Sequence, residues 1–254
     1  RLKLSKSEDR SEMLRMGAKL IGWASRKPTG SQTGVIRKGF GCGTCTWGSP
    51  PPGNSAEVVI RTADAVDAAT IAVGTRGLGG FKGLMLGSVG SRVAERSPVP
   101  VVVVPVDHAA DRPESERIVV GVDGSAGADR ALRWALDRAR ATDHIVAVSS
   151  WELRVFTGFE GMAIDPVDLS DATESMLQSA IARVRRAEDP AVEARVVEGD
   201  PRIVLLEESK NAHLLVVGAR GGGLVAHVLL GSVAHWLVHR PTVPVAVIPA
   251  AQST

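Results

Sequence analysis

The chain has 254 residues, of which 44% are hydrophobic and 23% charged, a composition typical of a soluble globular protein. No apolar stretch approaches the roughly 20 residues of a membrane-spanning helix, and the start of the chain lacks a signal-peptide core. We therefore expect no membrane partner and a cytoplasmic location.

Residues 1–52 form the least regular segment and carry ten basic against three acidic residues, although the net charge of the whole chain is only +2. No ladder of base-stacking aromatic residues accompanies this charge, so nucleic acid is not an expected partner. One helix is predicted over residues 8–25, and the Gly, Pro, Ser and Thr content of residues 29–52 favours loop. Cys42 and Cys45 have the spacing of a redox pair or half a zinc site, but the sequence offers no further ligands at a suitable spacing.

Residues 53–106, here called the first half, alternate helical and apolar segments. We expect a helix at 56–65, a strand at 70–73, a helix-like segment after Ser88 and a strand at 99–104. Residues 107–116 contain a proline and four acids and predict a polar linker.

Residues 117–254, here called the second half, have the pattern of a complete α/β domain. Strands are expected at 118–122, 145–148, 192–197, 214–217 and 243–248. Helices are expected at 126–141, 168–187, 202–209 and 232–239. Because apolar strands alternate with helices, this order predicts a parallel sheet with right-handed crossovers and helices on both faces.

One glycine motif occurs twice, at a constant offset of 144 residues. Gly74-Thr75-Arg76-Gly77 and, nine residues on, Gly87-Ser88 are matched by Gly218-Ala219-Arg220-Gly221 and Gly231-Ser232. Each copy lies between an apolar strand and a helix start, where glycines let main-chain N–H groups approach a ligand and the helix dipole favours an anion. The repeat predicts a duplicated nucleotide-binding module, but the first half lacks a counterpart of strand 118–122.

The second half supplies further candidate ligand groups. Arg220 adds a positive charge, Ser232 a hydroxyl, and Asp123 can accept hydrogen bonds from a ribose or adenine. Alternatively, Asp123 only caps the turn that follows it. The motif is neither a P-loop, since no lysine precedes Ser232, nor a dinucleotide fingerprint, since it follows the fourth strand.

His235 and His239 have a metal-binding spacing on one helix. No third ligand or carboxylate is evident nearby, so we expect a solvated or partly packed pair. Trp134 and Trp236 are expected to pack in the core or at an interface.

The chain resembles the universal stress protein family. The resemblance is carried by Val120-Gly121-Val122-Asp123-Gly124-Ser125, the duplicated G-x2-G-x9-G-Ser motif and the closing Val-Pro-Val strand, and covers residues 117–250 and about 53–106. It implies two tandem α/β domains, each an open five-stranded parallel sheet of order 3-2-1-4-5 with helices on both faces. Residues 1–106 would be a truncated or degenerate first repeat without its leading strand, 107–116 a linker and 117–254 a complete second repeat.

The resemblance also implies a ligand, which is ATP, with or without Mg²⁺, or cyclic AMP. The implied contacts in the second half are Asp123, the backbone near Val148, Gly218, Arg220, Gly221, Gly231, Ser232 and Val233. In the first half only Gly74, Arg76, Gly77, Gly87, Ser88 and Val89 match. Pairing through the fifth strands is implied too, either within the chain or in a homo-oligomer.

The function expected from these observations is adenine-nucleotide binding by a stress-response regulatory protein. The sequence shows no paired general base, metal-ligand cluster or activated nucleophile, so at most slow ATP hydrolysis is expected. Two alternatives remain open: a scaffold that has lost nucleotide binding, and an ATP-dependent adenylating enzyme on a similar sheet. The second would be expected to place its phosphate loop after the first strand.

Overall fold

The computed structural model describes residues 54–75, 86–105, 116–152, 165–221 and 230–250. All of them belong to one compact unit, residues 51–254. The predicted helix at 8–25, the cysteine pair and most of the linker lie outside the described residues.

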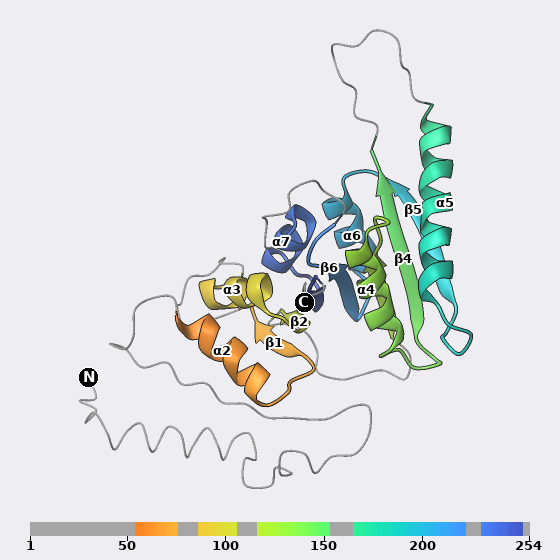
Figure 1. The fold of residues 1–254 in the computed structure, drawn as a ribbon. Helices are drawn as coiled ribbons and strands as arrows, with labels where there is room; N and C mark the ends of the chain where they lie inside the picture. Colours follow the sequence, from red (N-terminus) through yellow and green to blue (C-terminus); the bar gives the residue numbers. More distant parts are fainter. Residues whose placement is uncertain (1–53, 76–85, 106–115, 153–164, 222–229, 251–254) are drawn as a thin grey trace, which may run out of the picture. The chain divides into compact units, whose positions relative to one another are not determined.

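Helices and strands alternate through the described chain (Figure 1). In chain order they are α2 (Asn54–Ala65), β1 (Ile71–Gly74), α3 (Ser88–Arg96), β2 (Val101–Val104), β3 (Arg117–Gly121), α4 (Ala126–Leu136), β4 (His144–Trp151), α5 (Pro166–Val184), β5 (Val192–Glu198), α6 (Pro201–Ser209), β6 (Leu214–Gly218), α7 (Ser232–His239) and β7 (Val245–Ile248). The strands form one sheet of order β1-β2-β7-β6-β3-β4-β5, in which only the β2–β7 pair is antiparallel. The predicted α/β fold is therefore confirmed, and the strands of the second half, counted from β3, lie in the order 3-2-1-4-5.

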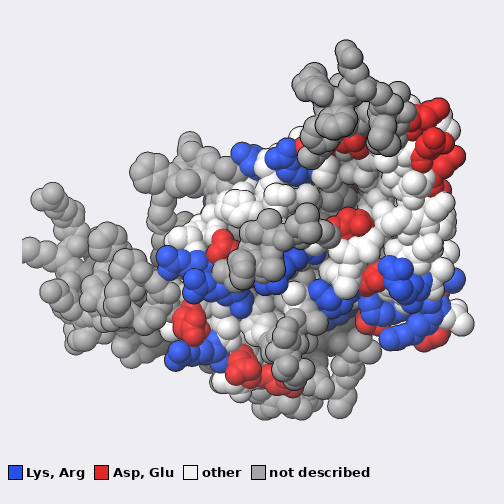
Figure 2. Space-filling model, turned by 45° about the horizontal axis from the view of Figure 1, so that its top comes forward, with Lys and Arg blue, Asp and Glu red and all other residues white. Residues whose placement is uncertain are grey.

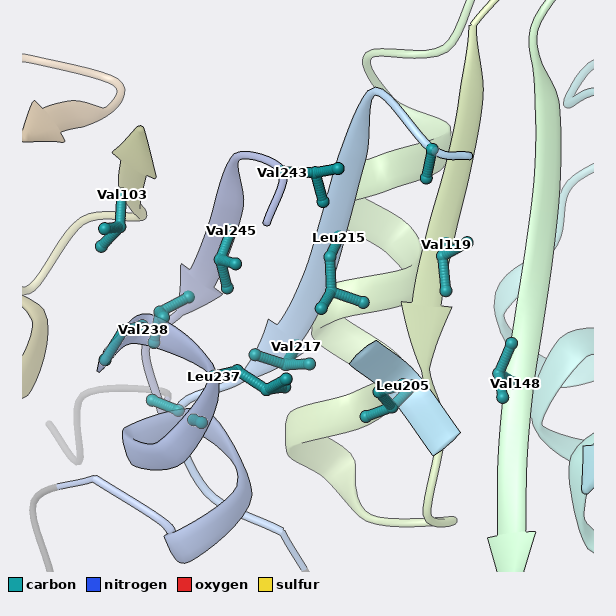
Figure 3. Close-up of a cluster of buried hydrophobic side chains, with 14 of the residues drawn as sticks. Val103, Val119, Val148, Leu205, Leu215, Val217, Leu237, Val238, Val243 and Val245 are labelled. Atoms are coloured by element: carbon teal, nitrogen blue, oxygen red, sulfur yellow. The ribbon is translucent and has the colours of Figure 1, made fainter. Parts of the chain in front are cut away.

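The central strands are apolar because both of their faces are covered. In β3, Ile118 and Val120 point to one face, where they pack with α4 and α5, whereas Val119 points to the other, where it packs with α6 and α7. Figure 3 shows the second of these clusters, with Val119 and Leu205 of α6 in it. At the sheet edge, β5 instead alternates charged side chains with half-buried apolar ones, which discourages pairing with another chain.

Polar side chains set the helix ends. Ser125 caps α4, because its hydroxyl oxygen accepts a hydrogen bond from the N–H of Ala128 at 3.2 Å. The predicted end of this helix at residue 141 is wrong. The helix stops at Leu136, and the N–H groups of residues 138 and 139 turn back to the carbonyl of Ala135.

Ion pairs join α4 to α5 and to the turn that follows α5. Arg133 donates two hydrogen bonds to the Asp189 carboxylate, at 2.5 and 2.7 Å, and Arg183 donates two to Asp129, each at 2.8 Å. The hydrogen bonds from Arg133 lower the pKa of Asp189 to about 2. Figure 2 shows basic and acidic side chains beside one another on one face of the molecule, consistent with such pairing.

The two closing strands, β2 and β7, pair with each other. Val101 lies opposite Val247, Val102 opposite Ala246 and Val103 opposite Val245. Because β2 and β7 are related by the 144-residue offset, this register is that of an approximate two-fold axis through Val102 and Ala246. The chain thus pairs the closing strands of its two halves internally.

In the part of the first half that the structure describes, both helices cover the same face of the sheet. Ile71, Val93 and Val101 form a small core under α2 and α3. On the opposite face Ala72 of β1 is exposed, whereas its counterpart Val216 in β6 is fully buried beneath α4. Among the described residues β1 has a single strand neighbour, β2.

Candidate functional site

A cavity of about 680 Å³ opens at the carboxyl ends of β3, β4 and β6, where α4, α6 and α7 begin. Its volume and position suit a small-molecule ligand of an open α/β sheet. The lining includes every position expected in the second half, namely Asp123, Val148, Gly218, Arg220, Gly221, Gly231, Ser232 and Val233.

The two parts of the glycine motif are held together by Ala219. Its N–H donates to the carbonyl of Ile248 at 2.7 Å, and its own carbonyl accepts from the N–H of Gly231 at 2.7 Å. The first bond anchors the end of β6 to the end of β7. The second closes the base of the loop, so that residues 218–221 and the start of α7 line the same cavity.

Glycine is required in this loop by the protein's own packing. A Cβ on Gly218 would lie 2.8 Å from the backbone of Gly127 in α4, and a Cβ on Gly127 would clash with the Arg220 carbonyl oxygen. A Cβ on Gly221 would clash with the Asp123 carboxylate. Sequence reasoning assigned Gly218 and Gly221 to ligand approach alone and gave Gly127 no role. The structure adds that α4 and the loop make close backbone contact here.

Asp123 caps the turn that follows it and also lines the cavity, so a contact with a ligand stays a prediction. Its Oδ1 accepts a hydrogen bond from the Ser125 N–H at 3.0 Å, so it does cap the turn. Its Oδ2 lies against Gly221, and the residue lines the cavity. The strand end is fixed by Val122, whose N–H donates to the Val148 carbonyl at 2.8 Å and ties β3 to β4.

Helix ends at this cavity differ in how they are capped. Ser125 caps α4, and Asp200 caps α6 by accepting from the Arg202 N–H at 2.8 Å. The cap of α7 is Gly231, which provides no side-chain hydrogen bond. The first N–H groups of a helix lack intrahelical partners and carry the positive end of its dipole, so α7 presents an anion-binding end to the cavity.

The charge at α6 supports this difference. A hydrogen bond from the Arg202 guanidinium lowers the pKa of Asp200 to about 2, so this carboxylate is ionised at neutral pH. The start of α6 therefore already has its anion. Near the start of α7 the cavity lining includes Arg220 and the exposed Ser232, and the Asp123 carboxylate lies beside Gly221 of the same loop.

Sequence reasoning missed the far wall of the cavity. This wall comes from the end of β4 and the β5–α6 corner, and its residues are Ser149, Ser150, Glu152, Gly199, Pro201, Val204 and Leu205. Gly199 has a φ of +138°, which favours glycine, and its N–H donates to the Trp151 carbonyl at 2.8 Å. The rule that ligands bind beyond the carboxyl ends of parallel strands could have pointed to both segments.

Comparison with known proteins decides the family. The model of the universal stress protein family matches residues 52–105 and 114–249. The chain belongs to the universal stress protein family.

Two relatives are universal stress proteins of Mycobacterium tuberculosis. Universal stress protein Rv2623 is 32% identical over 195 residues, covering 71% of this chain and 61% of the relative. Universal stress protein Rv1996 is 34% identical over 185 residues, covering 70% and 58%. This chain therefore spans less than two thirds of the length of these relatives. The crystal structure of a universal stress protein from Archaeoglobus fulgidus shares the fold, with a TM-score of 0.61, 23% identity and coverage of 98% of this chain and 85% of that one.

The first copy of the stress-protein motif is only partly described. Arg76 and Gly77 lie outside the described residues. Gly87, Ser88 and Val89 are exposed, and no described atom lies within 4 Å of a Cβ built on Gly74 or Gly87. The counterpart Gly218 touches Gly127 of α4, and no described helix takes that place beside β1. A nucleotide site in the first half stays a prediction.

The other candidates, His235, His239, Trp134 and Trp236, do not line the cavity. The rings of His235 and His239 lie 4.4 Å apart, and His239 also bonds to Ser91 of α3. Among the described residues no cluster of three or more His, Cys, Asp or Glu could hold a metal ion. Trp134 packs against the core beneath α4 and α5, and Trp236 against the one beneath α6 and α7. None of the helices in the described ranges is long and apolar enough to cross a membrane.

Proposed function

We propose that this stress protein binds an adenine nucleotide, such as ATP, in the cavity of residues 117–254, which form a complete second repeat. One observation carries the proposal. Of the three helices that begin at the cavity, α7 alone has no side-chain cap, and it begins beside the glycine loop. Phosphate oxygens would accept hydrogen bonds from these N–H groups. Residues 1–106 would belong to the first repeat, joined to the second by the linker at 107–116.

The residues of the cavity walls favour one orientation of the nucleotide. Phosphates would lie at residues 218–221 and 231–233, beside Arg220. Asp123, at the end of the central strand, would accept from the ribose hydroxyls. The base would enter the apolar part between Val148 and Leu205, both of which are buried. Adenine is the base that the family resemblance implies, and cyclic AMP fits in the same orientation.

Binding rather than turnover is the function that this lining supports. The described lining contains two carboxylates, Asp123 and Glu152, and one cation, Arg220, but no His, Cys or Lys. Positioning of phosphates alone permits at most slow ATP hydrolysis. We propose a regulatory role in which nucleotide occupancy changes the conformation or assembly of the protein, and we propose no protein-held Mg²⁺ site.

Calorimetric titration of the whole chain with ATP tests this proposal, with cyclic AMP and GTP as competitors. We expect one ATP per chain. Asp123→Ala should weaken binding about tenfold, as loss of a hydrogen bond to a charged group does. Asp123→Asn is the matched control, because its side-chain oxygen can still accept from the Ser125 N–H.

The ligand 2′-deoxy-ATP separates a ribose contact from a structural effect. It should bind the wild type more weakly than ATP does, and the Asp123→Ala variant should not distinguish the two. A folded wild-type chain that binds none of these nucleotides would favour the alternative of a scaffold that has lost its ligand.

A further inference from the structure

Helix α7 connects the cavity to the pairing of the two halves. Its first turn, residues 232–234, lines the cavity. Its later residues Leu237 and Val238 are fully buried in a cluster that also contains Val103 of β2 and Val245 of β7 (Figure 3). The helix therefore packs over the β2–β7 seam while its N-terminus faces the cavity.

A polar contact adds to this packing at the end of α7. The Nε2 atom of His239 lies 3.1 Å from the hydroxyl of Ser91 in α3. Its Nδ1 atom lies 2.8 Å from the carbonyl of His235. Because a carbonyl oxygen can only accept, Nδ1 carries a hydrogen, and both ring nitrogens of His239 are engaged. We call the Ser91–His239 contact the clasp.

The clasp joins two residues that have no identical counterparts in the internal repeat. At the 144-residue offset Ser91 corresponds to His235, and Glu95 corresponds to His239. The Ser91 hydroxyl is also 3.4 Å from the carbonyl of Leu86, a residue buried in the same cluster as Leu237. The contact thus belongs to this chain's own divergence between its halves and not to the duplicated motif.

We propose that Ser91 and His239 are positioning residues for the nucleotide site, so that the first half regulates the affinity of the second. The inference rests on the proposed function. An eight-residue helix is about 12 Å long, so a tilt at its last turn displaces the N–H groups at its first. The clasp and the seam core hold α7 in the orientation that directs these groups into the cavity. By linkage, a bound nucleotide must stabilise the seam in return.

The test measures ATP affinity of the whole chain by calorimetry for Ser91→Ala, His239→Ala and the double variant. Each single variant should weaken ATP binding about fivefold, the lower end of ordinary coupling between sites. The double variant should bind ATP with the same affinity as either single variant, because all three lose the same contact. Ser91→Thr keeps the hydroxyl and should retain affinity. Ser179→Ala, at an exposed position of α5, is the matched serine control.

Two further measurements separate positioning from general loss of stability. Ile181→Val, in the core beneath α5, should lower the free energy of unfolding without changing ATP affinity. Hydrogen exchange of the β2 amides should slow when ATP binds the wild type, and this response should be absent in Ser91→Ala.

The inference is overturned if wild type binds ATP and Ser91→Ala binds equally well, a result that leaves the proposed function intact. It is also overturned if Ile181→Val weakens binding as much as Ser91→Ala does. Failure of the wild type to bind any nucleotide removes the proposed function, and this inference with it.

Discussion

Three glycines shape the loop that we propose to bind phosphate. Gly127 and Gly218 bring the backbone of α4 against the end of β6, and Gly221 lets the Asp123 carboxylate approach the loop. The groups proposed to hold phosphate and ribose are therefore brought together by the backbone contacts of Gly127 and Gly218 and by the approach of the Asp123 carboxylate to Gly221. Such preorganisation reduces the ordering that binding has to impose.

Gly127→Ala tests this packing at a position that the motif does not include. Alanine normally stabilises a helix by about 1 kcal/mol relative to glycine. Here the added Cβ meets the Arg220 carbonyl oxygen, which is backbone and cannot rotate away. We expect the free energy of unfolding to fall by about 1–3 kcal/mol, as overpacking does, together with a loss of ATP affinity. Urea denaturation and calorimetry check both, and a stabilised variant with normal binding would contradict the packing argument.

Elements of the fold were predictable where burial on both sides makes a strand wholly apolar. The five strands of the second half were predicted within a few residues of their observed bounds, because short apolar runs such as Ile118–Val120 favour strands that are buried on both faces. The end of α4 was predicted wrongly, because Ala139 continues the apolar spacing of the helix although it lies in the turn beyond its end. The far wall of the cavity, which includes Glu152, was missed because it depends on how β4 and β5 end side by side. The local sequence pattern does not encode that arrangement.

The α4–α5 pair gives a prediction at the level of elements. The Arg133 hydrogen bonds hold the pKa of Asp189 at about 2, below the ordinary aspartate value of about 3.9. A depressed folded-state pKa contributes stability that is present above about pH 4 and is lost as pH falls toward about 2. Asp189→Asn removes the charge, so we expect it to lower stability at pH 7 and to flatten its dependence on pH between 4 and 2. Urea midpoints measured across this range for both proteins check the difference, and parallel pH profiles would contradict it.

On the scale of the whole molecule, the sheet continues from the first half into the second. The helices described in the first half, α2 and α3, lie on one face of the sheet, and β1 and β2 join the sheet of the second half through β7. The repeat made two related halves predictable from sequence, but its spacing alone could not show that one core cluster would contain residues of both. That cluster is the reason to expect the described unit to unfold cooperatively.

Val103→Ala tests this cooperativity from the first half. Val103 is fully buried among Val245, Leu237 and Val238 of the second half, so its truncation leaves a cavity that both halves share. We expect native-state hydrogen exchange to accelerate by a similar factor at the slowest amides of β2 and of β7. Val104→Ala, at a half-buried position on the other face of β2, is the matched control and should have a smaller effect. If only the β2 amides responded, the two halves would open independently. The core shared at the seam would then not transmit stability from one half to the other.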